Sequence, residues 1–169
     1  MSTFEILAFY RGVSATYPTD RPLLLKPRRD RRPKNSSSIF HDVADRWFNT
    51  HFGIAYRSHG LFLTSRPMSA STYAETPAHV MRVVPVSVYR YCWSPEVSDL
   101  LFAATRLATS SAETIEAYLD SAKYMEMGLQ EAHKAGHEVM LYCEQYIAIP
   151  VGLLDLTRGT NTPSIILPQ

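Results

Sequence analysis

Three short segments, far apart in the chain, carry the side chains best suited to chemistry. They are Tyr10-Arg11-Gly12 near the start, Phe62-Leu63-Thr64-Ser65 in the middle, and Glu138, which begins an apolar stretch. An arginine can hold a phosphate through two parallel hydrogen bonds. A carboxylate can stabilise the oxocarbenium-like centre that develops when a glycosidic bond breaks. In this order, the three segments indicate a site that holds a dinucleotide and cleaves its glycosidic bond.

Each of these residues also has a purely structural explanation. Arg11 could be a surface arginine at a strand end. Thr64 and Ser65 could cap the helix that follows, since Ser65 could accept from a free helix N–H. Glu138 could be a solvated acid at the start of a strand. The sequence leaves these alternatives open.

Further residues could complete a binding site. Gly12 would let a ligand approach the backbone closely. Arg57 and Ser58 precede the middle segment and could add polar contacts to a cofactor. Tyr73 could stack on a flat ring or belong to the core. The six histidines show no metal-ligand spacing, so we expect no metal site.

A basic segment, Lys26–Lys34, contains six basic residues and one acid, whereas the whole chain has a net charge of only +1. One interpretation is a solvated loop. The other is a surface that binds the phosphates of a nucleic acid or an acidic protein target, with affinity that falls as salt is added. On that interpretation the target-binding residues are Arg28, Arg29, Arg31 and Arg32.

Hydrophobic periodicity and turn residues predict the elements that position these segments. A strand over Phe4–Tyr10 precedes a long loop over Pro18–Ser38, and the middle segment is a strand over Leu61–Thr64. Helices are expected over Asp42–Phe52, Ser69–Glu75, Glu96–Leu107 and Ala112–Ala135, and strands over Met81–Tyr91 and Glu138–Ile149. A turn at Pro150–Gly152 and a polar tail, residues 157–169, complete the chain.

Particular residues mark the ends of these elements. Pro85 places the strand over Met81–Tyr91 at a sheet edge or a bulge. Ser110 and Glu113 fit a capping box for the long helix, and Gly136 fits its left-handed stop. Strands flank helices without a regular βαβ rhythm, which predicts an α+β fold in a single domain, 1–169.

Composition narrows the class of protein. A hydrophobic fraction of 46% and a charged fraction of 20% are typical of a globular domain. Two cysteines without metal spacing favour buried thiols in a reducing compartment over a disulfide scaffold. No secretory signal and no apolar stretch of 18 residues is visible, so we expect a cytoplasmic protein without a membrane partner.

The three segments together resemble the motifs of the mono-ADP-ribosyltransferases of toxins and phage effectors. Tyr10-Arg11-Gly12 is similar to that family's arginine motif, and Phe62 to Ser65 followed by Ala70 to Tyr73 is similar to its Ser-Thr-Ser strand. Glu138-Val139-Met140-Leu141 is similar to its glutamate motif. The resemblance implies a split β-sandwich with flanking helices around a nicotinamide pocket. It also implies NAD+ as the substrate, Arg11 at a phosphate or ribose, Thr64 and Ser65 shaping the pocket, and Glu138 as the catalytic residue.

Two positions depart from the family pattern. Leu63 replaces the first serine of the strand motif, and Gly136 stands where arginine-modifying members carry Gln or Glu. The acceptor of ADP-ribose is therefore open between a protein side chain, a nucleic acid and a small molecule. Two alternatives to the enzyme remain: a non-enzymatic module that binds nucleic acid or protein through the basic segment, and an inhibitor or immunity protein that retains the fold without activity.

Overall fold

The computed structural model describes residues 3–32 and 37–158 of the chain. They form a mixed α+β fold with two antiparallel sheets, which confirms the α+β part of the predicted fold class. The first sheet contains four strands, in the order β1 (Phe9–Gly12), β4 (Val80–Pro85), β7 (Tyr146–Pro150) and β2 (Leu23–Leu25).

The second sheet contains three strands, in the order β3 (Leu61–Leu63), β6 (Val139–Cys143) and β5 (Tyr89–Trp93). A bridge between Tyr10 and Thr64 connects the two sheets. The Tyr10 amide donates to the Thr64 carbonyl at 2.7 Å, and the Thr64 amide donates to the Tyr10 carbonyl at 2.9 Å. This bridge brings the arginine segment and the threonine segment side by side.

The two long strands predicted from the sequence are each two strands that belong to different sheets. Met81–Tyr91 divides into β4 and β5, and Glu138–Ile149 divides into β6 and β7. Pro85 ends β4 because it has no N–H for a further ladder bond. The predicted edge position is wrong, since β4 pairs with β1 on one side and β7 on the other.

The helix predicted over Asp42–Phe52 is α2 (Ser38–Phe52). It begins at Ser38, one of the two starts that the sequence allowed, the other being His41, and Ser37 caps it, with Oγ accepting from the Phe40 amide at 3.1 Å. The helix α4 (Pro67–Ser71) is displaced from the predicted range Ser69–Glu75, and α5 (Leu100–Arg106) is shorter than the predicted range Glu96–Leu107. The helix α3 (Tyr56–His59) was not predicted.

The helix predicted over Ala112–Ala135 is interrupted. It divides into α6 (Ala112–Ser121) and α7 (Leu129–Ala135). The interruption follows from a tertiary pairing, because Met125 exchanges two backbone hydrogen bonds with Trp93, at 2.9 and 3.0 Å, and cannot continue a helix. The cap of α6 is Ser111 rather than Ser110, with Oγ accepting from the Thr114 amide.

Both ends of the chain also depart from the predictions. The strand expected over Phe4–Tyr10 is a short helix, α1 (Thr3–Ile6), followed by β1. The loop expected over Pro18–Ser38 contains β2, and its residues 33–36 lie outside the described residues. A turn was expected at Pro150–Gly152, but Pro150 is the last residue of β7 and the next two residues begin α8 (Val151–Arg158). The tail residues 159–169 are not described.

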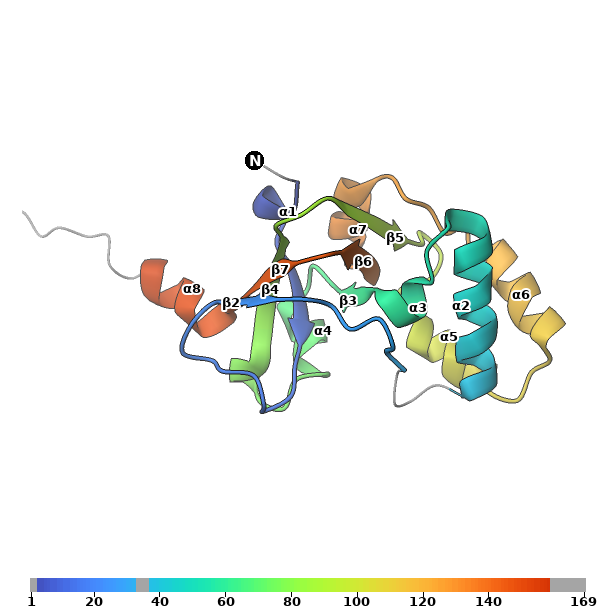
Figure 1. The fold of residues 1–169 in the computed structure, drawn as a ribbon, viewed down its shortest axis with the longest axis horizontal. Helices are drawn as coiled ribbons and strands as arrows, with labels where there is room; N and C mark the ends of the chain where they lie inside the picture. Colours follow the sequence, from blue (N-terminus) through green and yellow to red (C-terminus); the bar gives the residue numbers. More distant parts are fainter. Residues whose placement is uncertain (1–2, 33–36, 159–169) are drawn as a thin grey trace, which may run out of the picture.

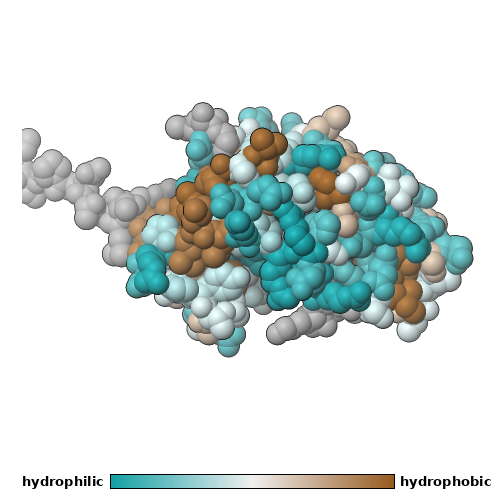
Figure 2. Space-filling view, viewed as in Figure 1, coloured by the Kyte–Doolittle hydropathy of each residue, from teal (hydrophilic) through white to brown (hydrophobic). Residues whose placement is uncertain are grey.

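The elements are arranged around two apolar cores. Figure 1 shows α2, α5 and α6 at one end of the molecule and the first sheet with α8 at the other, with the second sheet between. Alternate residues of β6 serve the two cores: Met140 packs with the helices, and Leu141 packs with the first sheet. The apolar surface in Figure 2 lies over the first sheet and its connection to β5, where Leu24, Val86 and Val88 are exposed.

Candidate functional site

A cavity of about 690 Å³ receives side chains from all three segments singled out in the sequence. Arg11 comes from β1, Thr64 from the end of β3, and Glu138 from the residue before β6. The cavity is also lined by other residues expected at a binding site, namely Tyr10, Gly12, Arg57, Phe62 and Tyr73. The structure thus places these segments around one cavity, and the roles of the residues remain predictions.

The hydroxyls of Thr64 and Ser65 bind the backbone that leads to Glu138. Thr64 Oγ1 donates to the Gly136 carbonyl at 3.2 Å, and Ser65 Oγ donates to the His133 carbonyl at 2.6 Å. The Gly136 carbonyl lies just after the C-terminal end of α7, and the His133 carbonyl, in the last turn of α7, also accepts from the Gly136 amide at 3.3 Å. Ser65 does not line the cavity. Its contribution is to hold α7 and the turn before Glu138 against β3.

Gly136 is required by the shape of this turn. It has a φ of 71° and ends α7 in the left-handed conformation, as predicted. A Cβ at this position would also lie 2.0 Å from Arg66 Nε, and the Arg66 guanidinium donates to the Ala135 carbonyl at 2.8 Å. The presence of glycine at position 136 is thus explained by the turn and by Arg66.

Glu138 lies at the start of α5 as well as at the start of β6. Its amide donates to the Ser98 carbonyl at 2.8 Å, and its Oε1 accepts from the Leu100 amide at 3.4 Å. Burial raises the pKa of Glu138 to about 7, with the negative charge of Asp99 acting in the same direction and Arg57 opposing both. The carboxyl therefore exchanges its proton near neutral pH, as acid–base and electrostatic chemistry requires.

Asp99 is a second carboxylate at the cavity, and the sequence analysis missed it. It caps α5, with Oδ1 accepting from the Leu101 amide at 2.7 Å, while its Oδ2 accepts from the Tyr73 hydroxyl at 2.5 Å. Burial, followed by the bond to Asp99, raises the pKa of Tyr73. Tyr73 is therefore held as a neutral donor at the cavity, with its ring 52% exposed. An Asp before an apolar run was the available signal for this cap.

Besides Arg66, three arginines line the cavity. The Arg57 side chain is almost completely buried, and burial lowers its pKa while Glu138 opposes that change. The guanidinium carbon of Arg31 lies 3.9 Å from the centre of the Phe62 ring, and that of Arg57 lies 5.2 Å from it. Arg11 completes the group. Arg31 was expected at a separate target-binding surface, and the structure places it with the cofactor candidates instead.

The four arginines of the basic segment have different surroundings. Arg28 pairs with Asp30 at 3.1 Å and Arg32 pairs with Asp42 at 3.3 Å, both on the surface. Exposed pairs of this kind contribute little to stability, about 0–1 kcal/mol. Arg29 and Arg31 instead turn toward the second sheet. The segment therefore presents fewer free arginines than its composition suggests.

Two expected cofactor contacts have structural explanations. Ser58 does not line the cavity; its hydroxyl and its amide both donate to Asp45. Gly12 lines the cavity, but a Cβ there would lie 2.4 Å from the Ala74 amide nitrogen and 2.5 Å from the Ala70 carbonyl oxygen. The close approach that requires glycine is thus made by α4 and the turn after it.

His137 is a further cavity residue that the sequence analysis did not single out. Its Nδ1 donates to the Ser94 carbonyl at 2.9 Å, which leaves Nε2 as the acceptor of the neutral ring. Phe102, which is 70% exposed, also lines the cavity. Neither residue belongs to a recognisable motif, and their places depend on the turn before β6 and on the start of α5.

Within residues 3–32 and 37–158, no group of three His, Cys, Asp or Glu side chains is placed to hold a metal ion. None of the described helices has the length and apolar character needed to cross a membrane. Comparisons of the chain with protein-family models, with curated proteins and with solved structures gave no match.

Proposed function

We propose that the chain is an ADP-ribosyltransferase that cleaves NAD+ and transfers ADP-ribose to a macromolecular acceptor. The observation that carries the proposal is the presence of Arg11 and Glu138 in the lining of a single cavity, together with the Tyr10–Thr64 bridge. The order of the three segments and their resemblance to the transferase motifs add support. On this proposal the two sheets are the split β-sandwich of that family.

In the proposed reaction, positive charge would develop on the ribose beside Glu138. The bond between the ribose C1′ and the nicotinamide nitrogen breaks, and its electron pair leaves with neutral nicotinamide. The ionised carboxylate of Glu138 stabilises the positive charge that grows on the ribose, through a hydrogen bond to a ribose hydroxyl. The acceptor then attacks C1′ and releases its proton to Glu138 or to water.

The other residues would hold the reacting groups. Arginines bind the phosphates, and the neutral hydroxyl and exposed ring of Tyr73 offer a surface for the flat nicotinamide. Phe102, which is exposed and lines the cavity, would offer an apolar contact to an acceptor. The cavity volume of about 690 Å³ is within the range of small-molecule sites.

The test is nicotinamide release and label transfer from NAD+ labelled in the adenylate part, with a cell lysate as the source of acceptors. Wild type should release nicotinamide, and Glu138→Gln should reduce the rate by about 10²- to 10⁴-fold. The control is Glu75→Gln, which removes the same charge at an exposed position outside the cavity. Equal rates for wild type and Glu138→Gln would exclude the proposed role of Glu138.

A further inference from the structure

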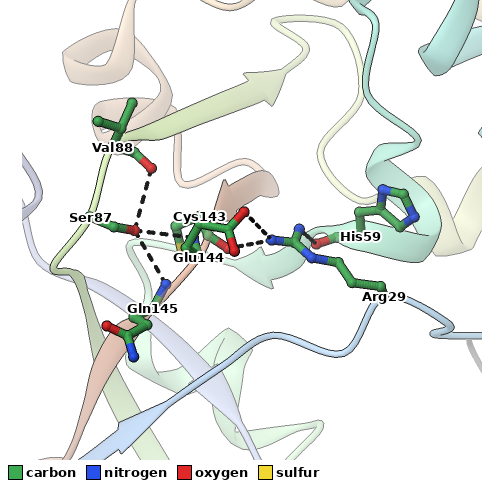
Figure 3. A network of polar contacts seen from close by, with 7 residues as sticks. All are labelled: Arg29, His59, Ser87, Val88, Cys143, Glu144 and Gln145. Carbon is green, nitrogen blue, oxygen red and sulfur yellow. Dashed lines mark hydrogen bonds and ion pairs between the residues drawn. The ribbon is translucent and has the colours of Figure 1, made fainter.

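The basic segment is attached to the corner where the chain crosses between the sheets. Figure 3 shows the Arg29 guanidinium between the β6–β7 connection and His59. Its Nη2 donates to the Cys143 carbonyl at 3.0 Å and to Glu144 Oε1 at 3.1 Å, and its Nη1 donates to the His59 carbonyl at 3.4 Å. The guanidinium also lies 4.3 Å from the centre of the Tyr142 ring. Arg29 therefore fixes the path of the segment.

Two residues later, Arg31 enters the cavity. Its amide donates to the Ser58 carbonyl at 3.3 Å, and its guanidinium covers the Phe62 ring. Burial lowers the pKa of Arg31 to about 10, and the positive charges of Arg11 and Arg57 act in the same direction against the attraction of Glu138. The positive charge of Arg31 is therefore repelled by those of both Arg11 and Arg57.

The cavity has more positive charge than its own carboxylates can balance. Its lining contains four arginines, Arg66 being the fourth, and two carboxylates, so the excess is two positive charges when both acids are ionised. Arg11 Nε is buried and has no hydrogen-bond partner among the described residues. Each bridging phosphate of a nucleotide carries one negative charge. A pyrophosphate group would therefore balance the excess charge and supply an acceptor for Arg11 Nε.

We propose that Arg11, Arg31 and Arg57 form a subsite for the pyrophosphate group of a dinucleotide. Arg31 is then a ligand-binding residue supplied by the basic segment, and it does not belong to a target-binding surface. The inference deepens the proposed function, since it names the part of the substrate that this end of the cavity holds. Binding of the group requires no turnover and can be measured without it.

The experiment measures binding by calorimetry in the Glu138→Gln background, in which turnover is expected to be slow. The probes are ADP-ribose, which contains the pyrophosphate, inorganic pyrophosphate alone, and nicotinamide riboside, which has no phosphate. Arg31→Gln should weaken ADP-ribose and pyrophosphate binding by about 10- to 100-fold, the loss of one charge-assisted contact. It should leave nicotinamide riboside binding unchanged.

The matched control is Arg28→Gln, because Arg28 has the same charge three residues earlier but is exposed and paired with Asp30. It should bind every probe like the background protein. Arg31→Lys keeps the charge without the planar fork and should give an intermediate loss. It replaces Arg31→Gln as the test if thermal denaturation shows that the latter is unfolded.

Two results would overturn the subsite. One is unchanged ADP-ribose binding in the Arg31 variants, and the other is an equal loss in Arg28→Gln, which would indicate a diffuse electrostatic field. The outcome is separable from the proposed function. Arg31-dependent ADP-ribose binding by a protein that releases no nicotinamide would support the subsite and refute the transferase. Nicotinamide release with an unchanged KM for NAD+ in Arg31→Gln would support the transferase and refute the subsite.

Discussion

Replacing Glu138 with glutamine should stabilise the protein, and the gain should depend on pH. In the folded protein the pKa of Glu138 is about 7, mainly because of burial, whereas the ordinary value is 4.5. Between these values the native state holds a proton that the unfolded chain has released. The free energy of unfolding of the wild type therefore falls as pH rises from about 4.5 to about 7, and the full cost remains above pH 7.

The size of the effect follows from the same two values. A difference of about 2.5 pKa units, at about 1.4 kcal/mol for each, amounts to about 3 kcal/mol. The attraction of Arg57 and Arg31 to the charged form is already contained in this net value, because both lower the pKa. Glutamine keeps the shape of a protonated glutamate, and its carbonyl can still accept from the Leu100 amide. The gain above pH 7 should therefore approach about 3 kcal/mol, or about 6–12 °C in Tm.

The assay is urea unfolding followed by tryptophan fluorescence, at intervals from pH 4.5 to pH 8.5. Glu138→Gln should match the wild type at the lowest pH and exceed it increasingly up to neutrality. Glu75→Gln, at an exposed position, should follow the wild type throughout. A stability difference that does not change with pH, or a loss of stability above pH 7, would refute the electrostatic reasoning.

Three other substitutions probe the positions around this carboxyl. Asp99→Asn keeps the helix cap but removes the second cause of the raised pKa of Glu138, so the acid limb of kcat/KM for NAD+ cleavage should move to lower pH in a pH–rate profile. Gly12→Ala should destabilise by about 1–3 kcal/mol in chemical unfolding, because a Cβ would meet the backbone after α4. Thr64→Val loses the hydrogen bond to the Gly136 carbonyl. Thermal unfolding should show that the free energy of unfolding falls by about 1 kcal/mol. Nicotinamide release should also slow, because the turn before Glu138 is less firmly held.

The α+β class could be predicted from local features of the sequence, whereas the joint position of the three segments was expected only from their resemblance to the transferase motifs. Gly136 after a helical stripe marks a helix end, and Glu138 before an apolar run marks a strand start. The course of the strands could not be predicted. A run such as Glu138–Ile149 has the same apolar alternation whether its two halves lie in one sheet or in two.

The residues missed at the cavity depend on tertiary contacts. Arg31 reaches the cavity because Arg29 binds Cys143 and Glu144, more than one hundred residues later in the chain. Charge composition alone made both arginines part of one surface. Asp99 approaches Glu138 only because the Glu138 amide binds Ser98, which brings the start of α5 beside β6. Neither contact has a signature in local sequence.

Ser87 links the two segments of the chain that pass from one sheet to the other. Its hydroxyl accepts from the amides of Glu144 and Gln145, so the β4–β5 and β6–β7 connections meet at one point (Figure 3). The two sheets are thus joined at this corner as well as at the Tyr10–Thr64 bridge. Because Arg31 follows Arg29 by only two residues, the contacts of Arg29 with Cys143 and Glu144 make the position of Arg31 depend on where β6 ends.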